Sequence, residues 1–218
     1  MEQLKGLSRE AYTKFKDGLL SRKIVPGTTL SQSDLADLLS VSVSPLRNAL
    51  KILENEGFVS VLPRSGIRIR KPDLELIKNS YQLRKIIEDA AIVRFAETCP
   101  PDELEAIRQR HRDIVTKAEA KDADIRAVFD EMSQIDWGFH QRVVDSLQNP
   151  LIASTYKTNH ERILLIRLDR HKATLLYIRN TMGEHEAVLD ALLDNDIEAA
   201  RAALSDHLNS AIRRAMGL

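Results

Sequence analysis

The stretch DWGFH, residues 136–140, places two side chains with metal-ligand chemistry four positions apart. In a helix, positions i and i+4 lie on one face, so Asp136 and His140 would point in the same direction. The helical stripe from Phe129 to Leu147 is otherwise mostly apolar, and it predicts that both side chains face a core. A single pair of this kind is most often a hydrogen-bonded carboxylate and imidazole, so the stretch alone does not indicate a metal site.

Two later histidines, His185 and His207, interrupt apolar helical stripes in the same way. The two stripes consist of Ile178, Met182, His185, Leu189 and Leu192, and of Ile197, Ala200, Leu204, His207 and Ala211. Three imidazoles and a carboxylate that all face inward are costly to bury unless one partner satisfies them together. A divalent metal ion does so, and we therefore predict a metal site formed by Asp136, His140, His185 and His207.

The predicted ligand set suits several transition metals. Zn²⁺ is the first choice, with Ni, Fe, Co, Cu or Mn as alternatives, because cellular supply decides among them more than affinity does. Open positions on such an ion could activate water, so a metal-dependent enzyme is an alternative to a binding protein. In a third alternative the metal itself is a signal. No further inward carboxylate is placed as an obvious general base, which favours binding over catalysis.

The segment that carries these residues shows helical periodicity to its end and no strand-like alternation. It divides into about six helices of roughly 20 residues each. The breaks lie near Pro100–Pro101, Lys121–Asp122, Asn149–Pro150, His171 and Asn195–Asp196. We predict an all-α six-helix bundle for residues 73–218. Its histidines outside the ligand set are expected on the surface or at helix ends: His111, His160 and His171.

Arg84 stands in an otherwise largely apolar stripe near the start of this bundle. Either it pairs with Glu88 one turn later, or its guanidinium points inward, where its fork suits a carboxylate. Asn159, in an apolar stripe that includes Tyr156 and Ile163, is a further candidate for the same pocket. Arg84 and Asn159 therefore predict a site for a small organic acid.

The overall composition indicates a folded protein with a divided charge. The chain has 218 residues, of which 43% are hydrophobic, and its net charge is zero. Residues 1–72 have a net charge of +5, from 12 Lys and Arg against 7 Asp and Glu, and residues 73–218 have −5. This division favours a nucleic-acid-binding head on an acidic body. The sequence has no apolar run that would indicate a membrane span or a signal peptide, and its single cysteine, Cys99, cannot form an internal disulfide. We therefore expect a cytoplasmic protein.

The basic head reads as a winged helix-turn-helix. Tyr12–Arg22 predicts a first helix, Ser31 and Asp34 cap a short second helix, and a third is predicted from Ser42 to Gly57. Burying its leucines would turn four polar residues toward a DNA groove: Ser44, Arg47, Asn48 and Lys51. Residues 58–62 and 66–70 alternate as strands around a basic turn, which predicts a hairpin wing.

The run IVPGTTLSQSDLADLLSVSVSPLRNALKILENEGFVSVLPRSGIRI resembles the winged helix-turn-helix of the GntR family of bacterial transcription regulators, across residues 8–71. The resemblance implies DNA contacts by Ser44 and Arg47 in the recognition helix, and by the wing residues Arg64, Ser65 and Gly66. Val43 departs from the family, in which an Arg is usual at this position. One base or phosphate contact is therefore expected to be absent or replaced by an apolar contact to a thymine methyl group.

The second segment resembles the FCD effector domain of the FadR subfamily, and its six helices resemble the VanR-type branch. The pattern D-x-x-x-H with two later histidines matches the metal-binding motif of that domain at the four predicted ligands. We therefore expect a DNA-binding domain in residues 1–72 and a metal- and effector-binding domain in residues 73–218. The expected function is a homodimeric transcription regulator, more specifically a repressor, that binds operator DNA under the control of a small carboxylate.

Overall fold

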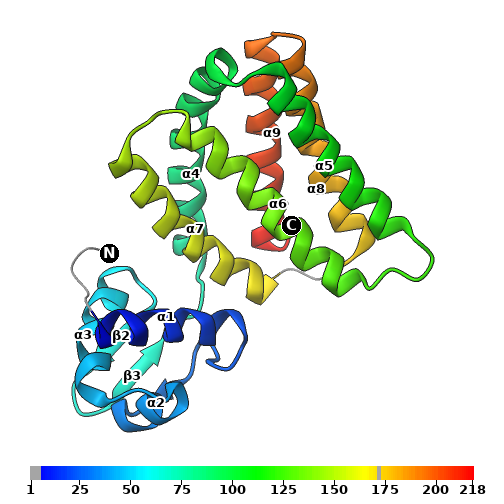
Figure 1. Ribbon diagram of the computed structural model, residues 1–218. Coiled ribbons are helices and arrows are strands. Elements are labelled where there is room, and N and C mark those ends of the chain that lie inside the picture. Colours follow the sequence, from blue (N-terminus) through cyan, green and yellow to red (C-terminus); the bar gives the residue numbers. More distant parts are fainter. Residues whose placement is uncertain (1–5, 171–172) are drawn as a thin grey trace. The chain divides into compact units, whose positions relative to one another are not determined.

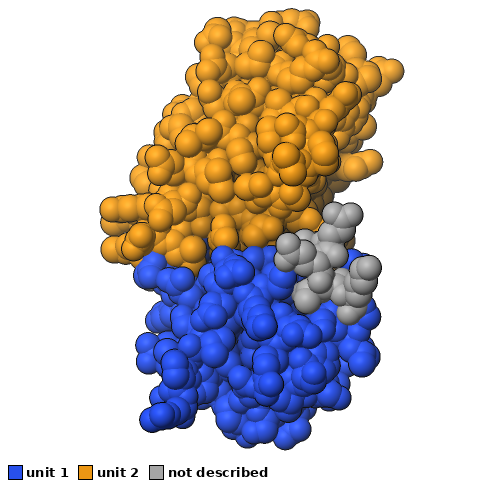
Figure 2. All heavy atoms as spheres, turned by 90° about the vertical axis from the view of Figure 1, so that its left-hand side faces the viewer, with its two compact units in different colours: residues 1–73, 164–169 blue, residues 74–163, 170–218 orange. Residues whose placement is uncertain are grey.

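The computed structural model describes residues 6–170 and 173–218 (Figure 1). Within these ranges the chain forms nine helices and one three-stranded sheet, which confirms the prediction of a mainly helical protein. It divides into two compact units: residues 1–73 with 164–169, and residues 74–163 with 170–218 (Figure 2). The break predicted near His171 lies outside the described residues.

The first unit contains three helices and a small sheet. The helices are α1 (Leu7–Leu20), α2 (Gln32–Leu39) and α3 (Val43–Asn55), and the strands are β1 (Thr29–Leu30), β2 (Val59–Leu62) and β3 (Gly66–Ile69). The strands are antiparallel in the order β1-β3-β2. Two helices joined by a short turn and followed by a hairpin form a winged helix-turn-helix.

The ends of these helices follow from their capping residues. The Ser31 hydroxyl accepts the backbone N–H of Asp34 at 3.0 Å and caps α2, as predicted. Helix α3 begins at Val43 after Ser42, also as predicted. The prediction for α1 was wrong at both ends, because the helix begins at Leu7 and ends at Leu20. The additional first turn is exposed at Leu7, so the apolar periodicity used to place the helix did not reach it.

The hairpin between β2 and β3 needs a glycine at its turn. Leu62 is opposite Gly66 in the ladder, and Gly66 has a φ of 102°. A Cβ atom at this position would collide with the carbonyl oxygen of Leu30 in β1. Gly66 therefore has a structural role in the wing, in addition to any contact with DNA.

The second unit is an all-helical bundle. Its helices are α4 (Leu74–Thr98), α5 (Pro101–Glu119), α6 (Ile125–Asp145), α7 (Pro150–Arg170), α8 (Leu175–Leu193) and α9 (Ile197–Met216). Residues 164–169, near the end of α7, are grouped with the first unit. The prediction of six helices is confirmed. Helix α9 packs against α4 and α8, and α5 packs against α6 and α8. None of the helices in the described part of the chain is long and apolar enough to span a membrane.

The core of the bundle has two apolar clusters with a polar layer between them. One cluster includes Ile92, Val143 and Leu189, and the other includes Met132 and Ile178. Along α6 and α8, buried polar residues stand between the two clusters. The bundle therefore positions a set of polar side chains away from solvent, where unpaired groups are costly.

Candidate metal centre

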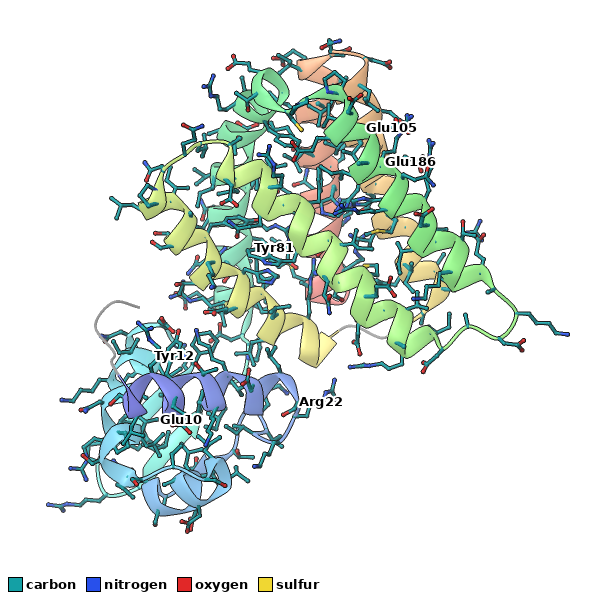
Figure 3. All side chains as sticks on the ribbon, in the orientation of Figure 1. Glu10, Tyr12, Arg22, Tyr81, Glu105 and Glu186 are labelled. Atoms are coloured by element: carbon teal, nitrogen blue, oxygen red, sulfur yellow. The ribbon has the colours of Figure 1, made fainter. Side chains whose placement is uncertain are left out.

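The polar layer brings together the four residues that the sequence predicts as metal ligands. Asp136 and His140 come from α6, His185 from α8 and His207 from α9, and all are at most 1% exposed. Each offers one ligand atom, and these atoms all lie within 4.8 Å of one another. Figure 3 shows ring nitrogens gathered inside the bundle.

The spacing of the ligand atoms fits a transition-metal ion. The Nε2 atom of His185 lies 3.2 Å from Nε2 of both His140 and His207, and 3.4 Å from Oδ1 of Asp136. Metal–nitrogen bonds of about 2.0–2.1 Å separate two nitrogens by about 3.4 Å at a tetrahedral angle and about 2.9 Å at a right angle. The three separations measured from His185 lie within this range, whereas Nε2 of His140 lies 3.6 Å from Oδ1 of Asp136.

Two carboxylates orient two of the imidazoles. Nδ1 of His140 lies 2.6 Å from Oε2 of Glu88, and Nδ1 of His207 lies 2.8 Å from Oε2 of Glu184. A carboxylate accepts a hydrogen bond, so each Nδ1 carries the proton. In the neutral tautomer each Nε2 then directs a lone pair toward the other ligands, as metal-binding histidines do.

His111 orients the third imidazole, and here the sequence prediction was wrong. His111 was expected on the surface or at a helix end, but it is buried in α5. Its Nδ1 lies 2.8 Å from the carbonyl oxygen of Ile107, and its Nε2 lies 3.0 Å from Nδ1 of His185. The carbonyl can only accept, so neutral His111 accepts at Nε2 the proton of His185 Nδ1. Nε2 of His185 is therefore unprotonated, and its lone pair also points toward the cluster.

Two of the three imidazoles that face the cluster, His185 and His207, are neutral at neutral pH. Burial lowers the pKa of His185 well below its usual value and that of His207 to about 4. Burial raises the pKa of Glu88, but Arg84 and His140 outweigh it and lower the pKa to about 2. The Nε2 atoms of His185 and His207 lie 3.2 Å apart, and their lone pairs repel each other. A cation bound between them would remove this repulsion, so the set of donor atoms fits a cation.

Glu88 links the cluster to two further helices. Its Oε1 atom accepts hydrogen bonds from Nε of Arg84 at 2.6 Å and from the hydroxyl of Tyr156 at 2.5 Å. The two alternatives for Arg84 are therefore not exclusive, because its side chain is buried and also pairs with Glu88. Asn159 is buried as well, and its amide donates to the carbonyl of Ser80 at 2.8 Å.

His160 lies outside this cluster. His160 is half-buried and stacks on Trp137, with ring centroids 3.3 Å apart. His171 lies outside the described residues. The orienting roles of Glu88, Glu184, Tyr156 and His111 were not predicted. His111 could have been found, since it lies on the same face of α5 as the buried residues Leu104, Ile114 and Ala118.

The candidate DNA-binding residues lie on a second, separate surface. Ser44, Arg47, Asn48 and Lys51 are exposed on α3, while its buried face consists of Leu46, Ala49, Leu50 and Leu53. Arg64 and Ser65 are exposed at the turn of the wing. Val43 is 37% exposed at the start of α3, beside this polar face. The structure thus presents the predicted residues to solvent as two basic groups, one on the helix and one on the wing.

Comparisons with known proteins match both units. Residues 7–69 match the model of the gntR family of bacterial regulatory proteins, and residues 79–210 match the FCD domain. An uncharacterized HTH-type transcriptional regulator of Streptomyces ambofaciens is 25% identical over 93% of the chain and 82% of its own length. The HTH-type transcriptional repressor RspR of Escherichia coli is 23% identical over 93% and 86%. The structure of E. coli McbR/YncC has a TM-score of 0.72 at 18% identity, over 98% of this chain and 99% of that one.

Proposed function

The chain belongs to the GntR family of bacterial regulatory proteins and carries an FCD domain, so it is a transcription regulator and not an enzyme; we propose that a metal site in its body binds the organic acid that controls its affinity for DNA. The proposed ligands are Asp136, His140, His185 and His207. The proposed domains are residues 1–72 for DNA binding and residues 73–218 for metal and effector binding.

One observation supports the metal site above all others. Three imidazole Nε2 atoms and a carboxylate converge in a buried layer, and each imidazole is held by a hydrogen bond at its other nitrogen. Histidines that only fill a core do not need free Nε2 atoms that converge on one point. Metal-binding histidines do, and their other ring nitrogen is then held by a hydrogen bond. Zn²⁺ is the proposed ion, with Ni, Fe, Co, Cu or Mn as alternatives, and the bound ion would supply positions for a carboxylate oxygen.

The charge around the site favours an anionic effector. Glu88 is balanced by Arg84, and Glu184 is balanced by Arg214, which donates to both of its oxygens. Asp136 is thus the one ligand whose charge offsets a divalent cation, and a net positive charge remains. A carboxylate neutralises it, and Arg84 is the nearby cation able to hold a second carboxylate oxygen.

The hydrogen bonds around the site reach every helix of the body. Glu88 in α4 joins His140 in α6 to Tyr156 in α7, and His111 in α5 joins His185 in α8, which faces His207 in α9. A ligand bound here changes contacts in all six helices. It can shift DNA affinity only as far as its own affinities for the two states of the protein differ.

We propose that the head binds a two-fold operator as part of a homodimer. The exposed face of α3 carries four polar residues, Ser44, Arg47, Asn48 and Lys51, and one such face is too short to specify an operator alone. The wing residues Arg64, Ser65 and Gly66 add contacts beside it. A repressor is the proposed mode, since the relative RspR bears that description.

A metal-sensing regulator is the second candidate function. It is favoured by the contact between Arg84 and Glu88, because Arg84 already has a carboxylate partner within the protein. Isothermal titration of carboxylic acids into apo and metal-loaded protein distinguishes the two candidates. Binding to the loaded form alone supports the acid-responsive regulator. Equal binding to both forms contradicts a metal-held acid, and metal-dependent DNA binding without any acid response supports the metal sensor.

A further inference from the structure

The recognition helix α3 carries an acidic residue at a position where local interactions do not favour one. Glu54 lies in the last turn of α3, where the carbonyl groups that end the helix repel a negative charge. It also lies two turns after Arg47, and therefore on the face of α3 that carries the proposed DNA contacts. A carboxylate on that face repels the phosphates of DNA. The position therefore indicates a separate contact for the Glu54 side chain.

The carboxylate of Glu54 binds the backbone of the wing. Its Oε1 atom accepts the N–H of Val61 in β2 at 2.7 Å. Strand β2 forms one edge of the sheet, whose order is β1-β3-β2. Phe58 accepts a hydrogen bond from Arg70 across the hairpin, and the alternation of an antiparallel ladder then turns the N–H groups of residues 59 and 61 away from β3. Glu54 thus satisfies a donor on the outer side of the edge strand.

Strand β1 holds the other side of the hairpin. Leu30 in β1 pairs with Ile67 in β3, and Gly66 lies so close to the carbonyl oxygen of Leu30 that a Cβ atom would not fit between them. The hairpin is therefore attached to the head on both sides, by β1 along β3 and by Glu54 along β2. Only the contact of Glu54 joins the hairpin to the helix that carries Arg47.

The turn at the tip of the wing fixes the direction of Arg64. The N–H of Ser65 donates to the carbonyl of Leu62 at 3.1 Å, so Pro63 and Arg64 are the two central residues of a tight turn. Arg64 has a φ of 64°, at a turn position that favours glycine or asparagine. Because the turn sets the backbone of Arg64 relative to the hairpin, the position of the hairpin relative to α3 decides where Arg64 meets DNA.

We propose that Glu54 is a positioning residue for DNA binding, and that its bond to Val61 sets the spacing between Arg47 on α3 and Arg64 on the wing. This role rests on the proposed function, because it uses the proposed DNA contacts of both arginines. A duplex presents its phosphates and base edges at fixed distances, so the two contacts add fully only in a protein that already holds the matching spacing. Without the bond, the wing has to be ordered when DNA binds, and the lost entropy weakens binding.

Two substitutions of Glu54 separate the hydrogen bond from the charge. Glu54→Ala and Glu54→Gln both remove the negative charge, but the amide oxygen of glutamine can still accept the N–H of Val61. We would measure the affinity of each full-length variant, at one salt concentration, for a duplex that the wild-type protein selects from a random-sequence library. One hydrogen bond changes an equilibrium constant by about fivefold, so Glu54→Ala should bind about fivefold more weakly than Glu54→Gln. Equal affinities of the two variants would contradict the positioning role.

Adding Arg64→Ala to each variant tests whether Glu54 acts through the wing. Two residues that act through one contact are not additive, so Arg64→Ala should weaken binding by about tenfold beside Glu54→Gln and by about threefold or less beside Glu54→Ala. Arg47→Ala is the control, and it should cost the same in both backgrounds because Arg47 lies on α3 itself.

The outcomes separate this role from the proposed function. An equal loss from Arg64→Ala in both backgrounds would overturn the positioning role and leave the DNA contact of Arg64 intact, since the bond of Glu54 would then serve only the fold of the head. A change of the same size with Arg47→Ala would overturn it as well, because Glu54 would then act on α3 and not on the wing. If Arg64→Ala has no effect even in the wild-type protein, both the positioning role and the proposed contact of Arg64 are wrong.

Discussion

Nε2 of His111 lies 3.0 Å from Nδ1 of His185, and this contact determines which nitrogen of His185 faces the cluster. The carbonyl of Ile107 holds the proton on the other nitrogen of His111, so His111 must accept. His111 is thus a positioning residue for the proposed metal site, at one remove from the ion.

His111→Leu should weaken metal affinity by about 10- to 100-fold, because His185 loses the acceptor that fixes its tautomer. His111→Gln can accept through its amide oxygen, so it should retain more of the affinity. Competition with a chromophoric chelator measures both. Equal affinity in wild type and His111→Leu would show that the contact has no role in positioning His185.

Removal of a proposed ligand should release the metal. His185→Ala and His207→Ala each take one of four ligands from the site and leave a polar cavity, so both should lose metal and melt at a lower temperature. The measurement is metal content by mass spectrometry after mild reloading, beside calorimetric melting. His160→Ala is the control, since His160 stacks on Trp137 outside the cluster. Full occupancy in a double variant of His185 and His207 would exclude the site.

The stability of the metal-free protein should fall as the pH is lowered from about 6.5 to about 4. The unfolded chain protonates its histidines near pH 6.5, whereas burial keeps folded His207 neutral down to about pH 4. The unfolded state therefore binds more protons in this window, and the free energy of unfolding decreases with falling pH. Between pH 6.5 and 5 the loss is about 2 kcal/mol for each such imidazole. Urea titrations across this range measure it.

His207→Gln is the control for the pH dependence, since it has no imidazole to titrate. Its free energy of unfolding should fall less between pH 6.5 and 5 than that of the wild type. Below pH 4.5 a further loss is expected, because the pKa values of Glu88 and Glu184 are lowered to about 2 in the folded state. A wild-type protein whose stability stays constant from pH 6.5 to 5 is incompatible with neutral buried imidazoles.

Arg84 should affect both stability and the acid response. Arg84→Ala leaves Glu88 buried without its cation, which costs about 3–5 kcal/mol of stability. Arg84→Lys keeps the charge but not the planar fork, so it should keep more stability and still weaken acid binding. Calorimetric titration and melting separate the two effects. If acid binding is unchanged in Arg84→Lys, the residue serves only as a partner of Glu88.

On the head, Arg47 and Lys51 should have different effects on DNA binding. Arg47→Ala should cost about 1–3 kcal/mol at the preferred operator, because a bidentate base contact is lost. Lys51→Ala should weaken binding to all sequences alike, because a phosphate contact carries no sequence information. Fluorescence anisotropy with operator and scrambled duplexes distinguishes them. Footprints without paired half-sites would argue against a dimer on a two-fold operator.

Much of the architecture could be predicted from the sequence because its signals are local. Pro100–Pro101 and Asn149–Pro150 mark helix boundaries that the structure confirms, and Ser31 marks the cap of α2. The two-residue strand β1 could not be predicted, because it depends on pairing with β3 rather than on a pattern of its own. The first turn of α1 was missed because its exposed residues lack apolar periodicity.

At the site, the four proposed ligands could be predicted from the sequence, but the residues that orient them could not. The spacing of Asp136 and His140 and the stripes around His185 and His207 show that these residues face inward. Their orienting partners come from other helices, as with Glu88 and His140, which are 52 positions apart. The sequence contains no register between helices, so it could not pair His111 with His185 or show that Arg84 is both buried and paired with Glu88.

The central claim is that the metal and a carboxylic acid act together on DNA binding, and operator affinity measured in four states tests it most directly. The states are apo protein, metal-loaded protein, apo protein with L-malate, and metal-loaded protein with L-malate. We predict that the acid changes operator affinity by about five- to 150-fold in the metal-loaded protein and leaves the apo protein unchanged. The same change in both forms, or none in the loaded form with any acid that binds it, would contradict the account.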